Sequence, residues 1–504
     1  MKKKVLAILL SAAMAMTLLA ACGSSDSSSD TTEDTTEETT EEEEAEEEEE
    51  EAAEETEEAA EETVEETTEE AEESDELTIT DGRVYLLNFK PETADAWEEL
   101  AEIYNSLGGN VTVVTAADGQ YDTTLQSEMA KDEAPTIFTI GSTTDAQTWD
   151  AYTYDLTDTA LYEHLTDKSL AITYNGKVAG VANCYESFGI IYNKTILEDY
   201  CTMDDAVITS VDDINSLDVL EAVCEDINNR IDEINETFGY ELEGAFSSSG
   251  LDSGSSWRFS GHLANMPLYY EFLDDGVEDI VSGEAEIDGT YLDNFKRVWD
   301  MYISTSAADP ATLTSGAYNA ESELGMMEAV FYQNGDWEYS ALTNEENGYL
   351  VTADDLDIMP IYFGVDDENE GLCVGTENYW AVNSQCTDEE IEATLTFLEW
   401  VITSDEGRES LVYDMGLSCP FDTFTDEYAS QNAFGAKANE LAAEGKTSIA
   451  WAFNATPNVD DWRADVVTAL TAYTDGSGDW DAVVTAFVDG WATQWALQEE
   501  AAAE

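Results

Sequence analysis

The sequence predicts an α/β fold of two domains, which follow a long acidic segment that does not fold. About 428 of the 504 residues follow that segment, too many for one compact core and enough for two domains. Short apolar runs of strand length alternate with segments whose apolar residues recur at helical spacing. This alternation predicts parallel sheets that helices cover on both faces.

The N-terminus has the features of an export signal. Lys2, Lys3 and Lys4 precede an apolar run over residues 5–19, and small residues follow it. Leu19-Ala20-Ala21-Cys22 resembles the bacterial lipobox, whose cysteine is acylated and becomes the new N-terminus. We therefore expect a signal peptide over residues 1–21 and a lipid on Cys22 that anchors the protein on the extracytoplasmic face of the cell membrane, in a bacterium of the Gram-positive type. An ordinary cleaved signal and an uncleaved anchor are the alternatives.

Residues 22–76 are predicted to be a disordered tether. Residues 26–76 carry about 30 carboxylates and no Lys or Arg, with almost nothing apolar to bury. Like charges along such a segment repel one another and extend it. A cation-binding or partner-binding tail is the alternative interpretation.

The charge of the chain limits the class of ligand. The sequence holds 114 acidic and 17 basic residues. So acidic a fold repels nucleic acid and lacks the basic surface that nucleic-acid binding needs. It also disfavours a broadly anionic ligand, whereas neutral sugars or cationic ligands fit better. Solubility alone is a sufficient reason for such acidity.

Six cysteines follow Cys22, at wide spacings and without a CxxC pair: Cys184, Cys201, Cys224, Cys373, Cys386 and Cys419. This spacing argues against zinc, and we expect neither a metal site nor a cofactor. Export permits disulfides, but their connectivity cannot be derived from spacing. We expect free thiols, which pack as small apolar side chains.

The pattern of the folded part gives the following elements in order. Strands are expected at residues 83–89, 111–115, 136–140, 189–192, 329–332, 356–363 and 378–382. Helices are expected at residues 94–105, 121–131, 206–235, 289–304, 388–403 and 480–497. Glu389 and Glu390 stand in the first turn of the 388–403 helix, where the helix dipole favours acids. The C-terminal third is expected to be mostly helical.

Four stretches carry a resemblance to a known family. They are residues 121–140 with Ala-Pro before a strand, 176–194 ending in Ile-Tyr-Asn-Lys, 329–337 with the sequence AVFYQNGDW, and 395–420 with Met-Gly before a proline. Their order and spacing behind a lipobox resemble the extracytoplasmic solute-binding proteins of ABC importers. The resemblance is to the carbohydrate-binding branch, extracellular solute-binding protein family 1, which includes maltose-binding proteins.

The resemblance implies a two-lobed periplasmic-binding-protein-like fold of type II, with a hinge and a cleft between the lobes. By analogy, lobe one comprises residues 77–183 and 375–418, and lobe two comprises residues 184–372 and 420–498. It also implies a monomer that carries a sugar to ABC permease subunits and is not an enzyme.

Sugar recognition uses flat aromatic faces for the C–H face of a pyranose, and carboxylates and amides for its hydroxyls. In the family the Trp of Gly-x-Trp faces the cleft, which here is Trp337, and packing at the end of the sheet is its structural alternative. Asp336 and Asn334 flank the same turn. Maltose-type proteins carry a ligand-contacting Glu at the spacing of Glu186, and Tyr185 precedes it in the first crossing between the lobes.

Further candidates follow predicted strands, because α/β folds bind ligands at the carboxyl edge of the sheet. These are Asn88, Lys90, Glu92, Ser142 and Asp145. Glu377, Asn378 and Tyr379 follow the second crossing. Strand alternation places Asn378 on the opposite face from Glu377 and Tyr379, so these three cannot all contact one ligand.

A Gly/Ser-rich loop at residues 247–256 is a candidate cleft edge, and it precedes Trp257, Arg258 and His262. Arg258 fits a uronic acid, or one of the many protein acids. His262 is more often a structural histidine than a ligand contact, and Trp451 is a late aromatic candidate.

Three functions of different classes are consistent with these features. The first is the substrate-binding subunit of a sugar importer, whose lobes close on the ligand. The second is a lipid-anchored glycoside hydrolase, which would need a pair of carboxylates either about 5–5.5 Å or about 6.5–9.5 Å apart. The third is a solute-binding protein for peptides or cations. The aromatic residues and the four family stretches favour the first.

Overall fold

The computed structural model describes residues 77–503 apart from 118–119, 253, 278–279, 310–312, 314–318 and 426–427. The expected signal peptide, Cys22 and the acidic tether lie outside the described residues. Residues Ser74–Glu504 form one compact unit, so the boundaries between the lobes stay a prediction. Among the described helices, none has the length and apolar character needed to cross a membrane.

One sheet has six strands in the order β2-β1-β3-β10-β5-β4. The strands are β1 (Val84–Asn88), β2 (Val111–Thr115), β3 (Ile137–Ile140), β4 (Ala171–Tyr174), β5 (Lys177–Ala182) and β10 (Tyr379–Val382). Strand β1 runs parallel to β2 and β3, whereas β10 runs antiparallel to both β3 and β5. The prediction of a parallel sheet is therefore confirmed for β1, β2 and β3 and wrong for β10, because β10 comes from a later pass of the chain and enters the sheet in the opposite direction.

Strands β4 and β5 form a hairpin that the sequence analysis missed. Asn175 and Gly176 make its two-residue turn, with φ of 48° and 78°. Positive φ at both central positions matches the twist of the flanking strands, which is why Asn-Gly is a strong hairpin signal. The hairpin forms the edge of the six-stranded sheet.

The second sheet has five strands, with β11-β9-β6-β7 as its main path and β8 paired with β6. The strands are β6 (Glu186–Asn193), β7 (Phe331–Gly335), β8 (Leu356–Met359), β9 (Glu370–Gly375) and β11 (Thr447–Ala450). Strand β6 is buried along its whole length and pairs antiparallel with β7, β8 and β9. Strand β8 ends at Met359 rather than at the expected residue 363, because Pro360 has no N–H to donate to a ladder.

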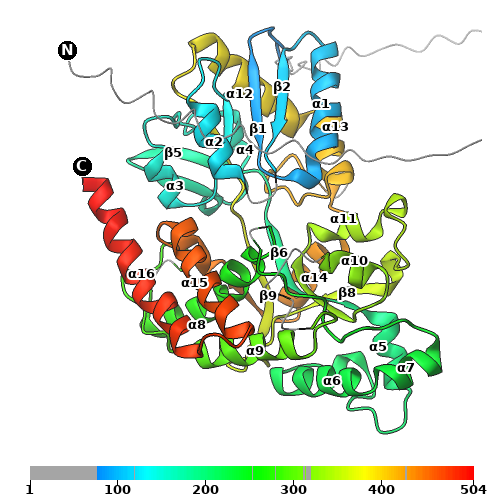
Figure 1. Ribbon diagram of the computed structural model, residues 1–504. Helices are drawn as coiled ribbons and strands as arrows, with labels where there is room; N and C mark the ends of the chain where they lie inside the picture. The colour runs from blue at the N-terminus through cyan, green and yellow to red at the C-terminus, as the bar shows by residue number, and fades with distance from the viewer. Residues whose placement is uncertain are drawn as a thin grey trace, which may run out of the picture. The chain divides into compact units, whose positions relative to one another are not determined.

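Helices surround each sheet (Figure 1). Those connected to strands of the six-stranded sheet are α1 (Ala94–Ser106), α2 (Tyr121–Met129), α3 (Thr143–Thr148), α4 (Ala160–His164), α12 (Asp388–Thr403) and α13 (Asp405–Glu409). The others are α5 (Lys194–Cys201), α6 (Leu217–Asn229), α7 (Ile231–Phe238), α8 (Asn265–Asp275), α9 (Leu292–Ser304), α10 (Ala320–Gly325), α11 (Glu338–Thr343), α14 (Ala433–Ala443), α15 (Val459–Thr474) and α16 (Trp480–Ala503). Helix α6 begins at Leu217, not at residue 206, because Ser216 caps it.

Alternation along the strands divides the core between the two faces of the six-stranded sheet. On β1, Val84 and Leu86 join the cluster that includes Trp97 of α1 and Phe397 of α12. Leu87 points to the opposite face and joins the cluster of α2. Period-two alternation therefore buries both faces, as the α/β prediction requires.

The chain passes from the six-stranded to the five-stranded sheet between β5 and β6, and returns between β9 and β10. A third segment pairs with the first, because Tyr185 forms an antiparallel bridge with Ser418. The functional candidates concentrate where these three crossing segments meet.

Candidate functional site

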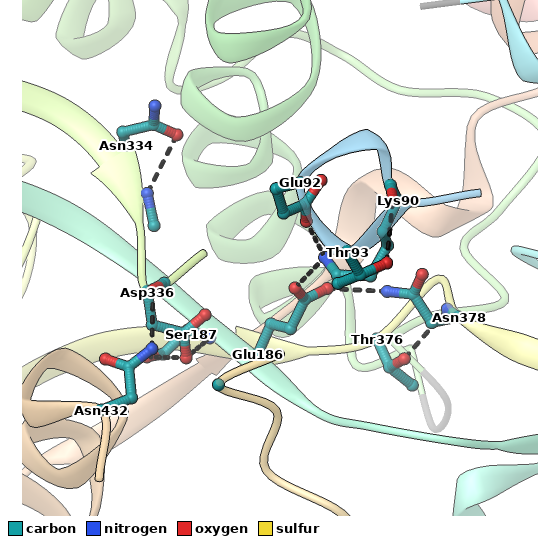
Figure 2. A network of polar contacts seen from close by, with 12 residues as sticks. Lys90, Glu92, Thr93, Glu186, Ser187, Asn334, Asp336, Thr376, Asn378 and Asn432 are labelled. Carbon is teal, nitrogen blue, oxygen red and sulfur yellow. Dashed lines mark hydrogen bonds and ion pairs between the residues drawn. The ribbon is translucent and has the colours of Figure 1, made fainter. Parts of the chain in front are cut away.

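Glu186 joins three segments that lie far apart in the sequence (Figure 2). It is the first residue of β6 and is only 6% exposed. One carboxylate oxygen, Oε1, accepts a hydrogen bond from Lys90 Nζ at 2.6 Å, and Oε2 accepts one from Asn378 Nδ2 at 2.7 Å. Both oxygens of this buried carboxylate therefore have charged or polar partners, which its burial requires.

Lys90 is held by two carboxylates. Its Nζ also lies 2.8 Å from Glu92 Oε1. Burial alone would lower the pKa of Lys90, but Glu186 and Glu92 outweigh it and raise the pKa well above its ordinary value. Asn88 fixes the loop, because its Nδ2 donates to Lys90 O at 2.8 Å and its Oδ1 accepts from Lys90 N at 3.2 Å. Asn88 thus positions Lys90.

Asp336 follows β7 and is bound to the start of β6 (Figure 2). Its Oδ2 accepts from Ser187 N at 2.9 Å and from Ser187 Oγ at 3.0 Å. Burial, together with the negative charge of Glu186, raises the pKa of Asp336 to about 8. Asn432 Nδ2 donates to the backbone oxygen of Asp336 at 2.6 Å and holds the turn from the other side.

Trp337 lies at the N-terminus of α11, and its ring covers Gly335. A Cβ on Gly335 would stand only 2.2 Å from the ring, so glycine is what allows this position. Lys90 Nζ is 6.0 Å from the ring centroid of Trp337. The partly buried indole therefore combines an apolar face with a nearby cation.

A cavity of about 320 Å³ opens beside these residues. Six of the predicted site residues line it: Lys90, Glu92, Tyr185, Glu186, Asp336 and Trp337. The rest of its wall is Tyr339, Ser340, Thr343 and Asn344, then residues 412–418, and finally Gln431 and Asn432. Its volume falls in the range of small-molecule sites.

The wall of the cavity combines aromatic faces with hydrogen-bonding groups. Tyr185, Trp337, Tyr339 and Tyr413 supply four rings, and the carboxylates are those of Glu92, Glu186, Asp336 and Asp414. The amides of Asn344, Gln431 and Asn432 add donors and acceptors. Sequence reasoning missed Tyr339, Tyr413, Asp414 and the three amides, because they stand on α11 and on segments without a strand-end signal.

Two predicted residues support the cavity from behind its wall. Asn378 holds Glu186, as described above, and its own Oδ1 has no hydrogen-bond partner among the described residues. Asn334 is fully buried, and its Nδ2 donates to the hydroxyl of Tyr332 at 2.6 Å. Neither residue lines the cavity.

Ser142, Asp145, Glu377 and Tyr379 lie outside the cavity lining. Ser142 caps α3 by accepting from Asp145 N, and Asp145 Oδ2 accepts from Gly141 N at 2.8 Å. Burial raises the pKa of Glu377, and the positive charge of Arg463 on α15 partly offsets this rise. Tyr379 packs against the α2 face of the sheet.

The remaining candidates form an aromatic cluster behind Trp337. His262 stacks on Phe188 with centroids 4.2 Å apart, and its burial lowers its pKa well below the ordinary value. The ring centroids of Trp257 and Trp337 are 6.0 Å apart, and Arg258 Cζ lies 4.4 Å from the ring centroid of Trp257. Arg258 Nη2 is 3.7 Å from Glu338 Oε1. Trp451 is buried beside Phe188. Trp257 and His262 pack against Trp337, and none of the four candidate side chains lines the cavity.

No group of three or more His, Cys, Asp or Glu side chains suited to a metal ion occurs among the described residues. The six described cysteines form no disulfide with one another in the structure, and the expectation of free thiols stays a prediction.

Comparison with known proteins identifies related sequences and folds. The family model described as bacterial extracellular solute-binding protein matches residues 99–443. No curated protein sequence matches the chain. Among solved structures, a chitin oligosaccharide binding protein aligns with a TM-score of 0.62 and 17% identity over 85% of this chain and 100% of its own.

Two further solved structures contain bound sugars. The solute-binding protein RafE in complex with raffinose has a TM-score of 0.58 and 16% identity over 83% of this chain and 100% of its own. A sugar transporter of Bacillus licheniformis in complex with stachyose has a TM-score of 0.57 and 16% identity over 82% of this chain and 100% of its own. At these identities, the similarity establishes the two-lobed fold of periplasmic binding proteins.

Proposed function

Because the chain belongs to the bacterial extracellular solute-binding protein family, we propose that it is the substrate-binding subunit of an ABC importer for a sugar or oligosaccharide. The ligand binds in the cavity beside Trp337 and is passed to permease subunits in the membrane. The protein carries out no chemistry, and the free energy of ligand binding drives closure at the hinge.

The composition of the cavity wall carries this proposal. Four aromatic rings, four carboxylates and three amides surround one space. Aromatic faces suit the C–H faces of a pyranose, and carboxylates and amides suit its hydroxyls. The three relatives described above bind, by their descriptions, chitin oligosaccharide, raffinose and stachyose.

The charges of the wall argue against an anionic ligand. Lys90 is the one cation in the lining among the described residues, and Glu186 and Glu92 already neutralise it. An anion would meet several acidic side chains and no available cation, which costs free energy in a partly desolvated site. An uncharged, hydroxyl-rich ligand avoids this cost.

Thermal unfolding with a panel of mono- and oligosaccharides, amino acids and short peptides tests the proposal. A ligand at 100 times its Kd adds about 2.7 kcal/mol to the free energy of unfolding. We expect stabilisation by at least one sugar and none by amino acids or peptides. Stabilisation by peptides alone, or turnover of a glycoside, would refute the proposed function.

Trp337→Ala locates the binding site. The substitution removes the central aromatic face, so we expect at least a tenfold rise in Kd for the sugar by calorimetry, corresponding to about 1.4 kcal/mol. Trp149→Ala is the matched control, since Trp149 is also partly buried among aromatic rings but lies outside the cavity lining. Equal affinities of the Trp337 variant and the parent would remove Trp337 from the site.

We further propose that Cys22 carries the lipid anchor and that residues 22–76 separate the binding body from the membrane. The proposal rests on the lipobox-like Leu-Ala-Ala-Cys sequence and on the acidic composition of the tract. Metabolic labelling with an alkyne fatty acid should label the parent chain in its bacterial host and not Cys22→Ala. Equal labelling of both would refute anchoring at Cys22.

A further inference from the structure

Two cysteines face each other where the crossing segments pair. Tyr185 forms an antiparallel bridge with Ser418, and Tyr185 N donates to Ser418 O at 2.9 Å. In an antiparallel pair, the residue before one partner opposes the residue after the other. Cys184 therefore opposes Cys419 across the two segments.

The backbone geometry of this position suits a disulfide. The neighbours of a hydrogen-bonded antiparallel pair form a non-hydrogen-bonded pair, whose Cα atoms lie about 4.5 Å apart. A disulfide requires Cα atoms about 4.4–6.8 Å apart. Successive side chains alternate between faces, so Cys184 and Cys419 share the face opposite to Tyr185 and Ser418.

The surroundings of the two thiols agree with this placement. Cys184 is a fully buried member of the apolar cluster that also contains Leu417 and Phe421, and Cys419 packs against the same cluster. The two thiols are close enough to influence each other electrostatically. The other four described cysteines have no cysteine opposite them on a paired strand.

We propose that Cys184 and Cys419 are a thiol-oxidation site that forms a disulfide across the hinge when the chain folds in the presence of a low-molecular-weight disulfide. The thiolate of Cys419 attacks one sulfur of the reagent and releases one small thiol. The thiolate of Cys184 then attacks Cys419 Sγ and releases the second small thiol. The two cysteines are oxidised by two electrons, the reagent is reduced by two electrons, and the two thiol protons leave with the products.

The burial of the two thiols decides at which stage of folding the exchange takes place. Cys419 is partly exposed, whereas Cys184 is fully buried. Burial raises the pKa of both thiols, so little thiolate is present in the folded protein. Exchange is therefore fastest before the crossing segments pack, and the bond forms during folding. The extracellular family of the chain places it in a compartment that permits disulfides.

Trypsin makes the test direct, because it separates the two cysteines from all others. Cleavage after Lys177, Lys194, Arg408 and Lys437 leaves Cys184 in residues 178–194 and Cys419 in residues 409–437, each as the sole cysteine of its peptide. The full chain is unfolded with reductant, refolded in a mixture of oxidised and reduced glutathione, blocked with N-ethylmaleimide and digested. We expect mass spectrometry to find the two peptides linked, and the link to disappear on reduction with dithiothreitol.

Substitutions provide the controls. Cys184→Ala and Cys419→Ser should each abolish the linked peptide. If Cys184→Ala fails to fold, Cys419→Ser still tests the link, because Cys419 is the more exposed of the two side chains. Cys386→Ser should retain the link, since Cys386 is equally part-buried but has no opposing cysteine. We also expect the oxidised parent to melt at a higher temperature than the reduced parent, and this difference to vanish in Cys419→Ser. Maleimide on both cysteines of the refolded parent, or Cys419 joined only to glutathione or to another cysteine, would overturn the proposal.

Discussion

Replacing Glu186 by glutamine probes the buried ion pair that joins the two sheets. The amide keeps the size of the side chain and an oxygen that accepts the hydrogen bond from Asn378. It removes the negative charge that lies 2.6 Å from Lys90 Nζ. The perturbation is therefore electrostatic, with little change in packing.

The structure sets the size of the effect. Two unit charges 2.6 Å apart interact by about 6 kcal/mol at an effective dielectric constant of about 20. Desolvation of both groups offsets much of this interaction, and removing one partner of a buried pair typically costs about 3–5 kcal/mol. Because Glu92 stays 2.8 Å from Lys90 and still partners its charge, we expect the lower end of this range, a loss of about 3 kcal/mol in the unfolding free energy.

Urea unfolding at pH 7, followed by tryptophan fluorescence, measures this loss. Glu390→Gln is the matched control, since Glu390 forms an equally short ion pair with Arg83 at 2.7 Å but both side chains are more exposed, at 21% and 27%. Glutamine also preserves the capping box of α12. We expect Glu390→Gln to lower the unfolding free energy by about 0–1 kcal/mol, because its ion pair is more exposed. Losses below 1 kcal/mol in both variants would refute the assignment of net stability to the Lys90–Glu186 pair.

Three further predictions concern the surroundings of the pair. Burial raises the pKa of Asp336 from 3.8 to about 8, so its contribution to the unfolding free energy is complete below about pH 4 and is lost as the pH rises toward 8. Asp336→Asn keeps an acceptor for Ser187 and should flatten the dependence of the unfolding free energy on pH in this window. An unchanged slope would contradict the raised pKa. Gly335→Ala should weaken sugar binding in calorimetry at least tenfold, because its Cβ displaces the Trp337 ring, and retained affinity would show that the ring position is unimportant. Gly176→Ala should lower the unfolding free energy by about 1–2 kcal/mol because of its φ of 78°, and a neutral effect in urea unfolding would contradict the strained turn.

The elements that the sequence predicted well are those whose local pattern and tertiary role agree. Residues 111–115 are a β-branched run that becomes β2 without a shift of either end. A capping box of Thr387 and Glu390 begins the apolar helix expected over residues 388–403, and α12 has the same bounds. The direction of β10 was not predictable in this way, because its antiparallel place between β3 and β5 depends on how later chain segments return to the first sheet.

The candidate site residues were likewise predicted well where a local pattern decides their position, and missed where tertiary pairing decides it. Asp336 comes directly after β7, and Lys90 and Glu92 stand in the loop that follows β1, where an α/β sheet presents its ligand edge; all three line the cavity. Ser142 follows a strand too, but its hydroxyl caps α3, so local hydrogen bonding decides its role. Tyr413 and Asp414 reach the cavity only because the segment after α13 pairs with Tyr185, just before β6, and no local pattern in the sequence encodes this pairing.

The three crossing segments carry the cavity, the ion pair and the cysteine pair, yet their contributions are physically separable. Trp337 contributes a ring face to the cavity wall and forms no ion pair, so its loss should change ligand affinity far more than unfolding free energy. Glu186 has both oxygens bound by protein groups, so its loss should act on the folded state with or without sugar. Cys419 contributes through a bond that exists only after oxidation, so its loss should matter only under oxidising conditions. If all three variants changed affinity, stability and redox dependence together, the crossing segments would act as one cooperative unit, and assigning separate roles to these side chains would be wrong.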